Sequence, residues 1–304
     1  MFQPPSRRDV LRASGGLGLL ALAGCRSSMT DSGTDWFDVS LAQWSNHRSL
    51  KAGEQSNLEW ITNARTRDDL GAVEFVNSFF KDKARDEAYL DQMKQRAADA
   101  DVRMLLIMID EEGSLAHQDD GHRSSAIENH KRWIEAAGHL GCHSIRVNAA
   151  GGGDAQEMMQ RAADSLVQLA DHGDPYGVSV IVENHGGRSS NGAWLAGVMR
   201  TADDPRVGTL PDFGNFDLGG GEQYDRYLGV TELMPFAKAV SAKSHDFDEA
   251  GDEVNTDFRR MLGIVKAAGY RGYIGIEFEG DRHSEDEGIL LTRDLLTRIR
   301  AELA

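Results

Sequence analysis

Short β-type runs recur along the chain about every 30 to 40 residues, and a segment with helical periodicity lies between each pair. Strands joined by helices must run parallel, and eight such units close most naturally into a barrel. An open, doubly wound sheet is the alternative, but no Gly-x-Gly-x-x-Gly motif follows the first run. The sequence therefore predicts an α/β fold, a single-domain (β/α)8 TIM barrel over residues 37–304. The eight runs begin near Asp38, Ala72, Val102, Cys142, Val178, Val207, Ala239 and Tyr273.

The segments between the runs carry helix signals of two kinds. Apolar residues recur at helical spacing in residues 86–93 and 258–266, and glycines at 138, 141 and 269 are expected to end helices. The chain of 304 residues is 40% hydrophobic, which is enough to bury the core of one large domain. Its formal net charge of -16 argues against nucleic acid or an anionic membrane surface as a partner.

The first 25 residues look like a bacterial Tat export signal rather than part of the fold. Arg7 and Arg8 form a twin-arginine pair, a mildly apolar stretch covers residues 15–21, and residues 22–25 read Leu-Ala-Gly-Cys, like a lipobox. Cleavage before Cys25 would leave that thiol to carry lipid, with residues 26–36 as a flexible tether. We therefore expect an exported lipoprotein that faces the periplasm or cell exterior and touches the membrane only through its lipid anchor.

Polar residues end every predicted strand, where the site of a TIM barrel is built. They are Gln43, Trp44 and His47, Glu74 and Asn77, Asp110 and Glu111, Arg146 and Asn148, Glu183 and His185, Asp212 and Asn215, Lys243, His245 and Asp246, and Glu277 and Glu279.

Glu183 is the most informative of these residues, because it ends the apolar run of residues 178–182. An ionised carboxylate at the end of a buried strand needs a cation or a donor beside it. Asp212 and Glu277 end two other runs at equivalent heights, so three carboxylates should gather on one side of the barrel mouth. Oxygen ligands favour Mn²⁺ or Mg²⁺, with Co²⁺ or Zn²⁺ open if His245 also binds. An ion network with Arg146, Lys243 and neighbouring histidines is the alternative.

At these positions the chain resembles the xylose-isomerase-like TIM barrels, a family that includes sugar isomerases, ketose 3-epimerases and inosose dehydratases. The resemblance covers roughly residues 38–300 and is carried by residues 181–185 (Ile-Val-Glu-Asn-His), 211–215 (Pro-Asp-Phe-Gly-Asn) and 272–277 (Gly-Tyr-Ile-Gly-Ile-Glu). It implies that Glu183, Asp212 and Glu277 bind one divalent metal together with a histidine from the seventh strand.

The seventh run departs from the family pattern. The family often has His-x-Lys-Asp there, whereas residues 240–246 read Val-Ser-Ala-Lys-Ser-His-Asp and place Ser241 where the histidine is expected. Either His245 reaches back to the metal or the fourth ligand is missing. We predict His245 as the ligand and Lys243 as a substrate contact or electrostatic partner.

These parts predict an enzyme that removes a proton beside a sugar carbonyl. Glu183 and Glu277 are the expected catalytic residues, one on each side of the substrate. Return of a proton to the opposite face of the same carbon gives epimerisation, return to the neighbouring carbon gives isomerisation, and loss of a leaving group gives β-elimination from a keto-glycoside or cyclitol. A sugar-binding lipoprotein without turnover is a third alternative.

No phosphate-binding loop or basic cluster appears, so a non-phosphorylated sugar or keto-sugar is the expected small-molecule partner. Oligomerisation through the exposed barrel helices stays open. The predicted substrate wall is Trp44, His47, Arg146, His185, Asn215 and Lys243.

Three other histidines, His117, His122 and His130, fall on a polar helical stretch and are expected to be solvated.

Overall fold

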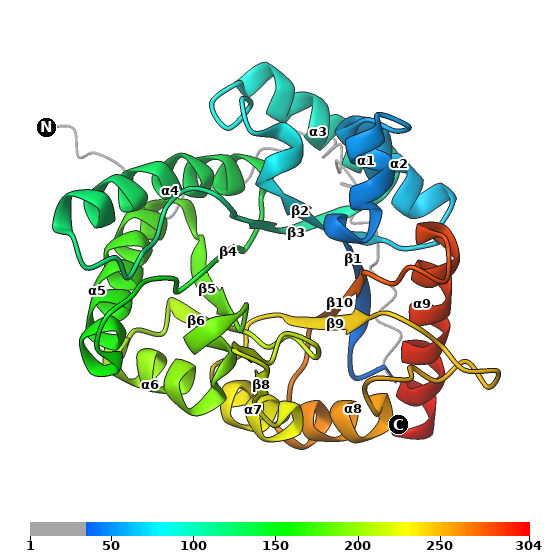
Figure 1. Cartoon of the computed structure of the whole chain (residues 1–304). Coiled ribbons are helices and arrows are strands. Elements are labelled where there is room, and N and C mark those ends of the chain that lie inside the picture. Colours follow the sequence, from blue (N-terminus) through cyan, green and yellow to red (C-terminus); the bar gives the residue numbers. More distant parts are fainter. Residues whose placement is uncertain (1–34) are drawn as a thin grey trace, which may run out of the picture. The chain divides into compact units, whose positions relative to one another are not determined.

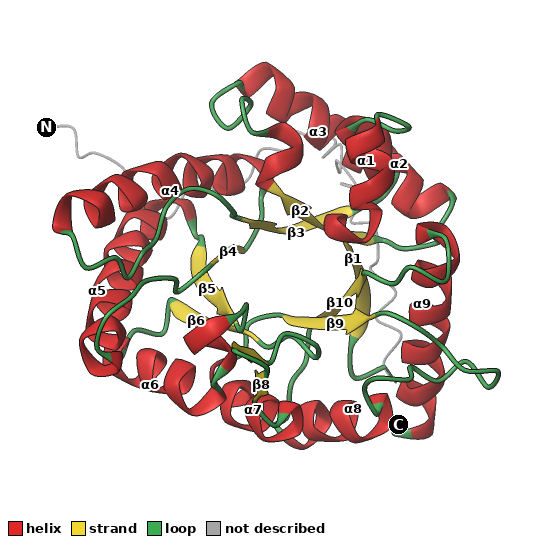
Figure 2. Ribbon diagram, viewed as in Figure 1, coloured by secondary structure: helices red, strands yellow, loops and turns green. Residues whose placement is uncertain are grey.

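The computed structural model describes residues 35–304 of the chain. Within this range, eight strands form one parallel sheet, and helices surround it on the outside (Figures 1 and 2). The strands of this sheet are β1 (Asp38–Ala42), β2 (Ala72–Val76), β3 (Arg103–Met108), β4 (Ser144–Val147), β5 (Ser179–Glu183), β6 (Val207–Leu210), β9 (Val240–Ser244) and β10 (Tyr273–Phe278).

The sheet closes into a barrel. Its strands are hydrogen-bonded in the order β6-β5-β4-β3-β2-β1-β10-β9. Parallel bridges at Thr209–Ala237 and Asp212–Ser241 join the segments of β6 and β9, which stand at the two ends of this order. The Ser241 N–H donates to the carbonyl oxygen of Pro211 at 2.9 Å, and the Phe213 N–H donates to the Ser241 carbonyl at 3.1 Å. Closure of this kind removes the unpaired edges that an open sheet would expose. The fold is thus the predicted (β/α)8 barrel.

Helices connect successive strands, as parallel pairing requires. A small antiparallel hairpin, formed by β7 (Asp217–Gly219) and β8 (Glu222–Gln223), follows β6. The helices are α1 (His47–Ala52), α2 (Asn57–Thr66), α3 (Glu87–Asp99), α4 (Asp120–Leu140), α5 (Ala155–Gly173), α6 (Gly192–Ala202), α7 (Arg226–Leu233), α8 (Phe258–Ala267) and α9 (Glu285–Glu302).

Strand periodicity divides the buried side chains into two sets. In β5, Val180 and Val182 belong to the large core between the strands and the helices, whereas Ile181 belongs to a small cluster of apolar residues inside the barrel. Because alternate side chains of a strand point to the same side, Glu183 shares the inward direction of Ile181. The sequence of one strand therefore places an acidic group above an apolar layer in the barrel interior.

One glycine makes room for a further buried carboxyl group in that interior. A Cβ atom at Gly275 of β10 would lie 2.8 Å from both carboxylate oxygens of Glu74 of β2. Glu74 is 1% exposed and accepts a 2.6 Å hydrogen bond from the Ser40 hydroxyl group. The absence of a side chain at position 275 is thus a packing requirement of the barrel.

The element predictions agree closely with the structure. Each observed strand begins within two residues of its predicted start, and Gly141 follows α4 in the left-handed conformation with a φ of 78°. Gly269 likewise follows α8 with a φ of 75°. Gly138 does not end a helix as expected, because it lies inside α4, where its lack of a side chain lets Tyr176 pack closely.

The predictions for the signal segment and Cys25 fall outside the described residues, as does most of the predicted tether. Packing of the barrel begins within the last residues of that tether, because Trp36 is 5% exposed and packs against Phe37. Among the described helices, none combines the length and apolar character that a membrane crossing requires.

Candidate active site

Three carboxylates meet at the carboxyl ends of the strands. Glu183 is the last residue of β5, Asp212 lies two residues beyond β6, and Glu277 lies near the end of β10. One carboxylate oxygen from each residue lies within 4.8 Å of the other two. Exposed fractions of 0%, 0% and 3% place all three in the interior, as the positions of the strand ends predicted.

Two buried cations flank the three carboxylates. The Arg146 Nε and the Glu183 Oε2 lie 2.8 Å apart, and a second guanidinium nitrogen of Arg146 lies 2.8 Å from the Asp110 Oδ1. On the other side, the Lys243 Nζ lies 3.0 Å from the Glu277 Oε1. The ion network that the sequence left open as an alternative is therefore present around the carboxylate group.

The cations do not balance the carboxyl groups around them. Six carboxyl groups (Glu74, Asp110, Glu183, Asp212, Glu277 and Glu279) surround Arg146 and Lys243, which leaves an excess of four negative charges if all six are ionised. The excess is concentrated in the interior, where unpaired charge is most costly.

The carboxyl groups respond to this environment in different directions. Burial raises the pKa of Glu74 to about 7 and is also the main cause of the raised pKa values of Glu183 and Asp212. Burial opposes ionisation of Glu277 too, but the charges of Lys243 and Arg146 outweigh it and lower the pKa of this residue.

The residues fit a bound divalent cation. Glu183 Oε2 forms an ion pair with Arg146 but has no hydrogen-bond partner among the described residues. Three converging carboxylates are the ligands that hard divalent cations prefer, and the two positive charges of such a cation would offset half of the excess. Glu183, Asp212 and Glu277 are therefore the residues that could hold a metal.

Ser241 lies at the place where the family pattern has a histidine. Its hydroxyl group contacts the Asp212 Oδ2 at 2.6 Å and the Glu277 Oε2 at 3.1 Å, so it joins two members of the carboxylate group. Ser241 and Lys243 share one face of β9 and are paired in register with Gly275 and Glu277 of β10.

His245 does not join the carboxylate group in the structure. It follows the end of β9, one step farther along the barrel axis than Lys243, and its side chain is 41% exposed. Its Nε2 atom lies 4.0 Å from the Glu279 Oε2, and the described residues that gather with Glu183 do not include it. The arrangement thus offers oxygen ligands and leaves the role of His245 as a metal ligand a prediction.

A pocket of about 430 Å³ opens beside the carboxylates. Its size matches that of a small-molecule site. Of the predicted wall, Trp44, Arg146 and His185 line it, together with Lys51, Val76, Ser78, Asp110, Glu111, Glu277 and Glu279.

The remaining predicted wall residues are not part of the pocket lining but contact other residues of the site. His47 stacks on Trp44 with ring centroids 4.9 Å apart. The Asn215 side-chain amide donates to the Glu183 Oε1 at 2.8 Å, and its oxygen accepts from Lys243 at 3.3 Å. Asn215 therefore holds Glu183 in position, and Lys243 holds Glu277.

Lys51 and Glu279 contribute to the pocket although neither belongs to the predicted substrate wall. The Lys51 Nζ lies 4.3 Å from the centre of the Trp44 ring, and Glu279 accepts a hydrogen bond from the Trp44 indole N–H. Glu279 is among the polar residues expected at the strand ends, and it lies two residues after Glu277 and so points in the same direction. Lys51 gives no such signal, since it comes from a helix that folds back over the barrel mouth.

A search of curated protein sequences finds no significant match. Among solved structures, the IolI protein with a bound zinc atom superposes with a TM-score of 0.67 at 15% identity, covering 87% of this chain and 98% of that chain. D-psicose 3-epimerase in the presence of D-fructose gives 0.63 at 11% identity, covering 87% and 99%.

A sugar phosphate isomerase/epimerase from Parabacteroides distasonis gives a TM-score of 0.66 at 15% identity, covering 89% of this chain and 96% of that chain. At these identities the structures support the fold alone. The family model described as xylose isomerase-like TIM barrel matches residues 67–300, which is more than half of the sequence. The chain therefore belongs to the xylose isomerase-like TIM barrel family.

Proposed function

We propose that the protein is a divalent-metal-dependent isomerase or epimerase that acts on a non-phosphorylated sugar or keto-sugar. The observation that carries the proposal is the convergence of Glu183, Asp212 and Glu277, of which Glu277 lines the pocket. Membership of the family supports it, as do structural neighbours whose names include D-psicose 3-epimerase and a sugar phosphate isomerase/epimerase.

The proposed reaction is proton transfer next to a carbonyl group. In its ionised form, Glu277 takes the proton from the carbon, and the electron pair moves onto the carbonyl oxygen. In its protonated form, Glu183 returns a proton to the opposite face of the same carbon to give the epimer. Return to the neighbouring carbon gives the isomer when the hydroxyl proton on that carbon passes to the former carbonyl oxygen. A bound Mn²⁺ or Mg²⁺ would supply positive charge that stabilises the enediolate oxygen.

The pocket favours hydroxyl groups over phosphate. Asp110, Glu111, Glu277 and Glu279 supply four carboxylates to its lining, whereas Lys51 and Arg146 supply two cations. Arg146 is already paired with Glu183 and Asp110. Carboxylates accept hydrogen bonds from sugar hydroxyl groups but repel a phosphate dianion. This balance supports the proposal of a neutral sugar as the substrate.

The side chains of β9 favour a second candidate, a sugar-binding protein without turnover. Lys243 lies 3.0 Å from Glu277, and Ser241 replaces the imidazole expected by the family pattern. A carboxylate held in these contacts is a poorer proton acceptor, because its charge is already stabilised. The lyase alternative uses the same first proton transfer and is distinguished by its product.

Hydrogen exchange tests the proposal. The full chain is loaded with Mg²⁺ and incubated in D₂O with free ketoses and 3-keto-glycosides, and the sugars are separated from protein and analysed by proton NMR. We expect deuterium at a carbon next to the carbonyl group and formation of an isomer or epimer. A shortened, unsaturated product would favour the lyase instead. Binding of a sugar without exchange would support the binding protein and contradict the enzyme.

Matched variants identify the groups responsible. Glu277→Gln and Glu183→Gln should each lower the exchange rate by about 10²-fold or more, because one proton acceptor or donor is lost. Glu87→Gln changes an exposed carboxylate on α3 and should leave the rate unchanged. Unaltered exchange in a folded Glu277→Gln variant would remove Glu277 from the mechanism.

We also propose export as a Tat lipoprotein anchored through Cys25, on the basis of the sequence pattern. Fractionation of cells that express the full chain tests this proposal. The wild-type protein should be recovered with membranes, and Cys25→Ser should move to the soluble fraction. A Cys25→Ser protein that stays with the membranes would contradict anchoring through this residue.

A further inference from the structure

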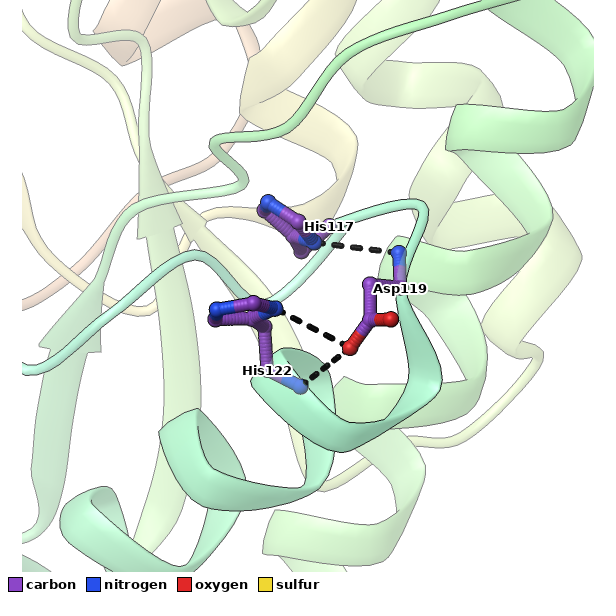
Figure 3. A group of neighbouring side chains, drawn as sticks. All are labelled: His117, Asp119 and His122. Atoms are coloured by element: carbon purple, nitrogen blue, oxygen red, sulfur yellow. Dashed lines mark hydrogen bonds and ion pairs between the residues drawn. The ribbon is translucent and has the colours of Figure 1, made fainter.

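A second group of metal-binding residues lies outside the candidate active site. His117, Asp119 and His122 come from the loop between β3 and the start of α4 (Figure 3). One donor atom from each residue lies within 4.8 Å of the other two. The His122 and Asp119 side chains are 75% and 61% exposed, so a cation and its water ligands could reach this group from solvent.

Hydrogen bonds already link the three residues (Figure 3). The Asp119 Oδ1 accepts hydrogen bonds from the backbone N–H of His122 at 2.8 Å and from its imidazole Nδ1 at 3.0 Å. The His117 Nδ1 accepts from the Asp119 backbone N–H at 3.0 Å. The His122 ring thus contacts the Asp119 carboxylate and the His117 ring contacts the Asp119 backbone, with the two ring centroids 4.8 Å apart.

The backbone beneath the group is held by a neighbouring unit of the barrel. Ala116 pairs with Gly151 in a parallel bridge, and its N–H donates to the Ala150 carbonyl at 2.9 Å. Arg161 of α5 donates to the Ala116 carbonyl at 3.1 Å, and Ser165 donates to the Leu115 carbonyl at 2.6 Å. Because the chain just before His117 is fixed, less ordering is needed when a ligand binds.

The donor set differs from that of the barrel mouth. Two imidazoles and one carboxylate suit borderline cations such as Zn²⁺, whereas the three carboxylates inside the barrel suit harder ones. Asp119 caps α4 with Oδ1 alone, which leaves Oδ2 for a cation. Hydrogen bonds from the His122 backbone and ring hold the pKa of Asp119 below its usual range, so the carboxylate is ionised at neutral pH.

The spacing of the donors is compatible with one cation after a small adjustment. Ligand atoms about 2.0–2.2 Å from a tetrahedral zinc ion lie roughly 3.3–3.6 Å apart. The observed group, with atoms within 4.8 Å, must therefore contract by about 1 Å. Rotation of two largely exposed side chains about their own bonds can supply this change, while the backbone hydrogen bonds that hold the loop stay in place.

We propose that His117, Asp119 and His122 form a surface site for Zn²⁺ or a similar borderline divalent cation. The loop that carries the site begins with Asp110 and Glu111, two residues of the pocket lining. A cation there would tie the start of α4 to the preceding loop and so restrict movement at one side of the pocket. The site is independent of the proposed catalytic metal.

Equilibrium dialysis of the metal-stripped full chain against Zn²⁺ at pH 7.5 tests the site, with bound zinc measured by mass spectrometry. His117→Ala/His122→Ala should bind one zinc ion fewer per chain than the wild type. Glu183→Gln/Glu277→Gln should retain that ion. His139→Ala, which removes another histidine of α4, should not change the binding. Equal zinc content in the wild type and the double histidine variant would overturn the proposal.

Two further measurements separate ligation from a structural effect. Asn is as good a helix cap as Asp, so Asp119→Asn should leave the melting temperature unchanged while it lowers zinc affinity at least tenfold. Zinc should also shift the ring NMR signals of His117 and His122 in the wild type. Unmoved ring signals at zinc saturation, or unchanged affinity in Asp119→Asn, would contradict the site.

Discussion

Lys243 shows how a single side chain determines the state of the carboxylate group. It is 3% exposed, its Nζ lies 3.0 Å from Glu277 and 3.4 Å from Glu279, and it also contacts Asn215. An ammonium group in this position favours the ionised form of Glu277 in the interior and lowers its pKa. Its positive charge therefore offsets part of the negative charge of the carboxylate group, and a bound cation would offset a further part.

Replacement of Lys243 by Met should destabilise the protein by about 3–5 kcal/mol, because the buried Glu277 loses its cation. Urea denaturation measures the change in the free energy of unfolding. The double variant Lys243→Met/Glu277→Gln should lose less than the sum of the two single variants, since neither charge is then left unpaired. Lys94→Met, on the exposed face of α3, is the control and should unfold at the wild-type urea concentration.

Strictly additive effects of Lys243→Met and Glu277→Gln would show that the two side chains do not interact. That result would contradict the ion pair on which our description of the site depends.

The sequence identifies a site residue most clearly when that residue lies at the end of a buried strand. Glu183, Asp212 and Glu277 were found because the end of a buried strand fixes both the position and the direction of a side chain. His245 lies beyond the end of β9, and its distance from the carboxylates depends on where that strand stops. No pattern in the sequence fixes that point to within one residue.

At the scale of elements, packing between β2 and β10 depends on a glycine. Gly275→Ala would bring a Cβ atom to 2.8 Å from both Glu74 carboxylate oxygens. We expect a loss of about 1–3 kcal/mol, because Glu74 must leave its hydrogen bond with Ser40 or the strands must move. Thermal unfolding followed by circular dichroism measures this loss.

Gly263→Ala provides the matched control for that substitution. Gly263 lies within α8 and has no atom within 4 Å of the position of an added Cβ. Alanine favours a helix interior, so this variant should be more stable than the wild type by roughly 0.5–1 kcal/mol. Equal changes in the two variants would contradict a specific clash between position 275 and Glu74.

Helix α4 corrects an expectation from sequence. His130 is 2% exposed instead of solvated, and its Nδ1 lies 2.7 Å from the Ala126 carbonyl oxygen. The polar pattern of this helix did not indicate that His130 is buried, because α4 packs against neighbouring helices as well as the barrel. His117 and His122 do lie at the surface, although His117 precedes the helix.

The burial of His130 predicts a pH effect on stability. Burial lowers the pKa of its imidazole, so the unfolded chain binds the proton more tightly than the folded protein does. Stability should therefore fall as the pH decreases below about 6.5, the ordinary histidine pKa. In His130→Gln, urea denaturation between pH 7.5 and 5.5 should show a smaller decrease. An identical pH dependence in both proteins would exclude this contribution.

For the whole molecule, the fold was predictable because its signal is repeated. Eight apolar runs at regular spacing leave few ways to pair the strands, and an error in one run would not change the class of fold. The lining of the pocket was less predictable, since Lys51 and Ser78 reach it from segments that follow β1 and β2. Their approach depends on loop geometry, for which the sequence carries no periodic signal.

We propose that Glu183, Asp212 and Glu277 hold a divalent cation at the mouth of the barrel without His245, the ligand expected from the sequence. Electron paramagnetic resonance of free Mn²⁺ during titration of the metal-stripped chain tests it directly. The His117→Ala/His122→Ala background removes the proposed surface site. We expect one tightly bound Mn²⁺ per chain in that background, retention in a further His245→Ala variant, and loss with Glu183→Gln/Asp212→Asn. Binding that survives the loss of both carboxylates, or disappears with His245→Ala alone, would contradict the account.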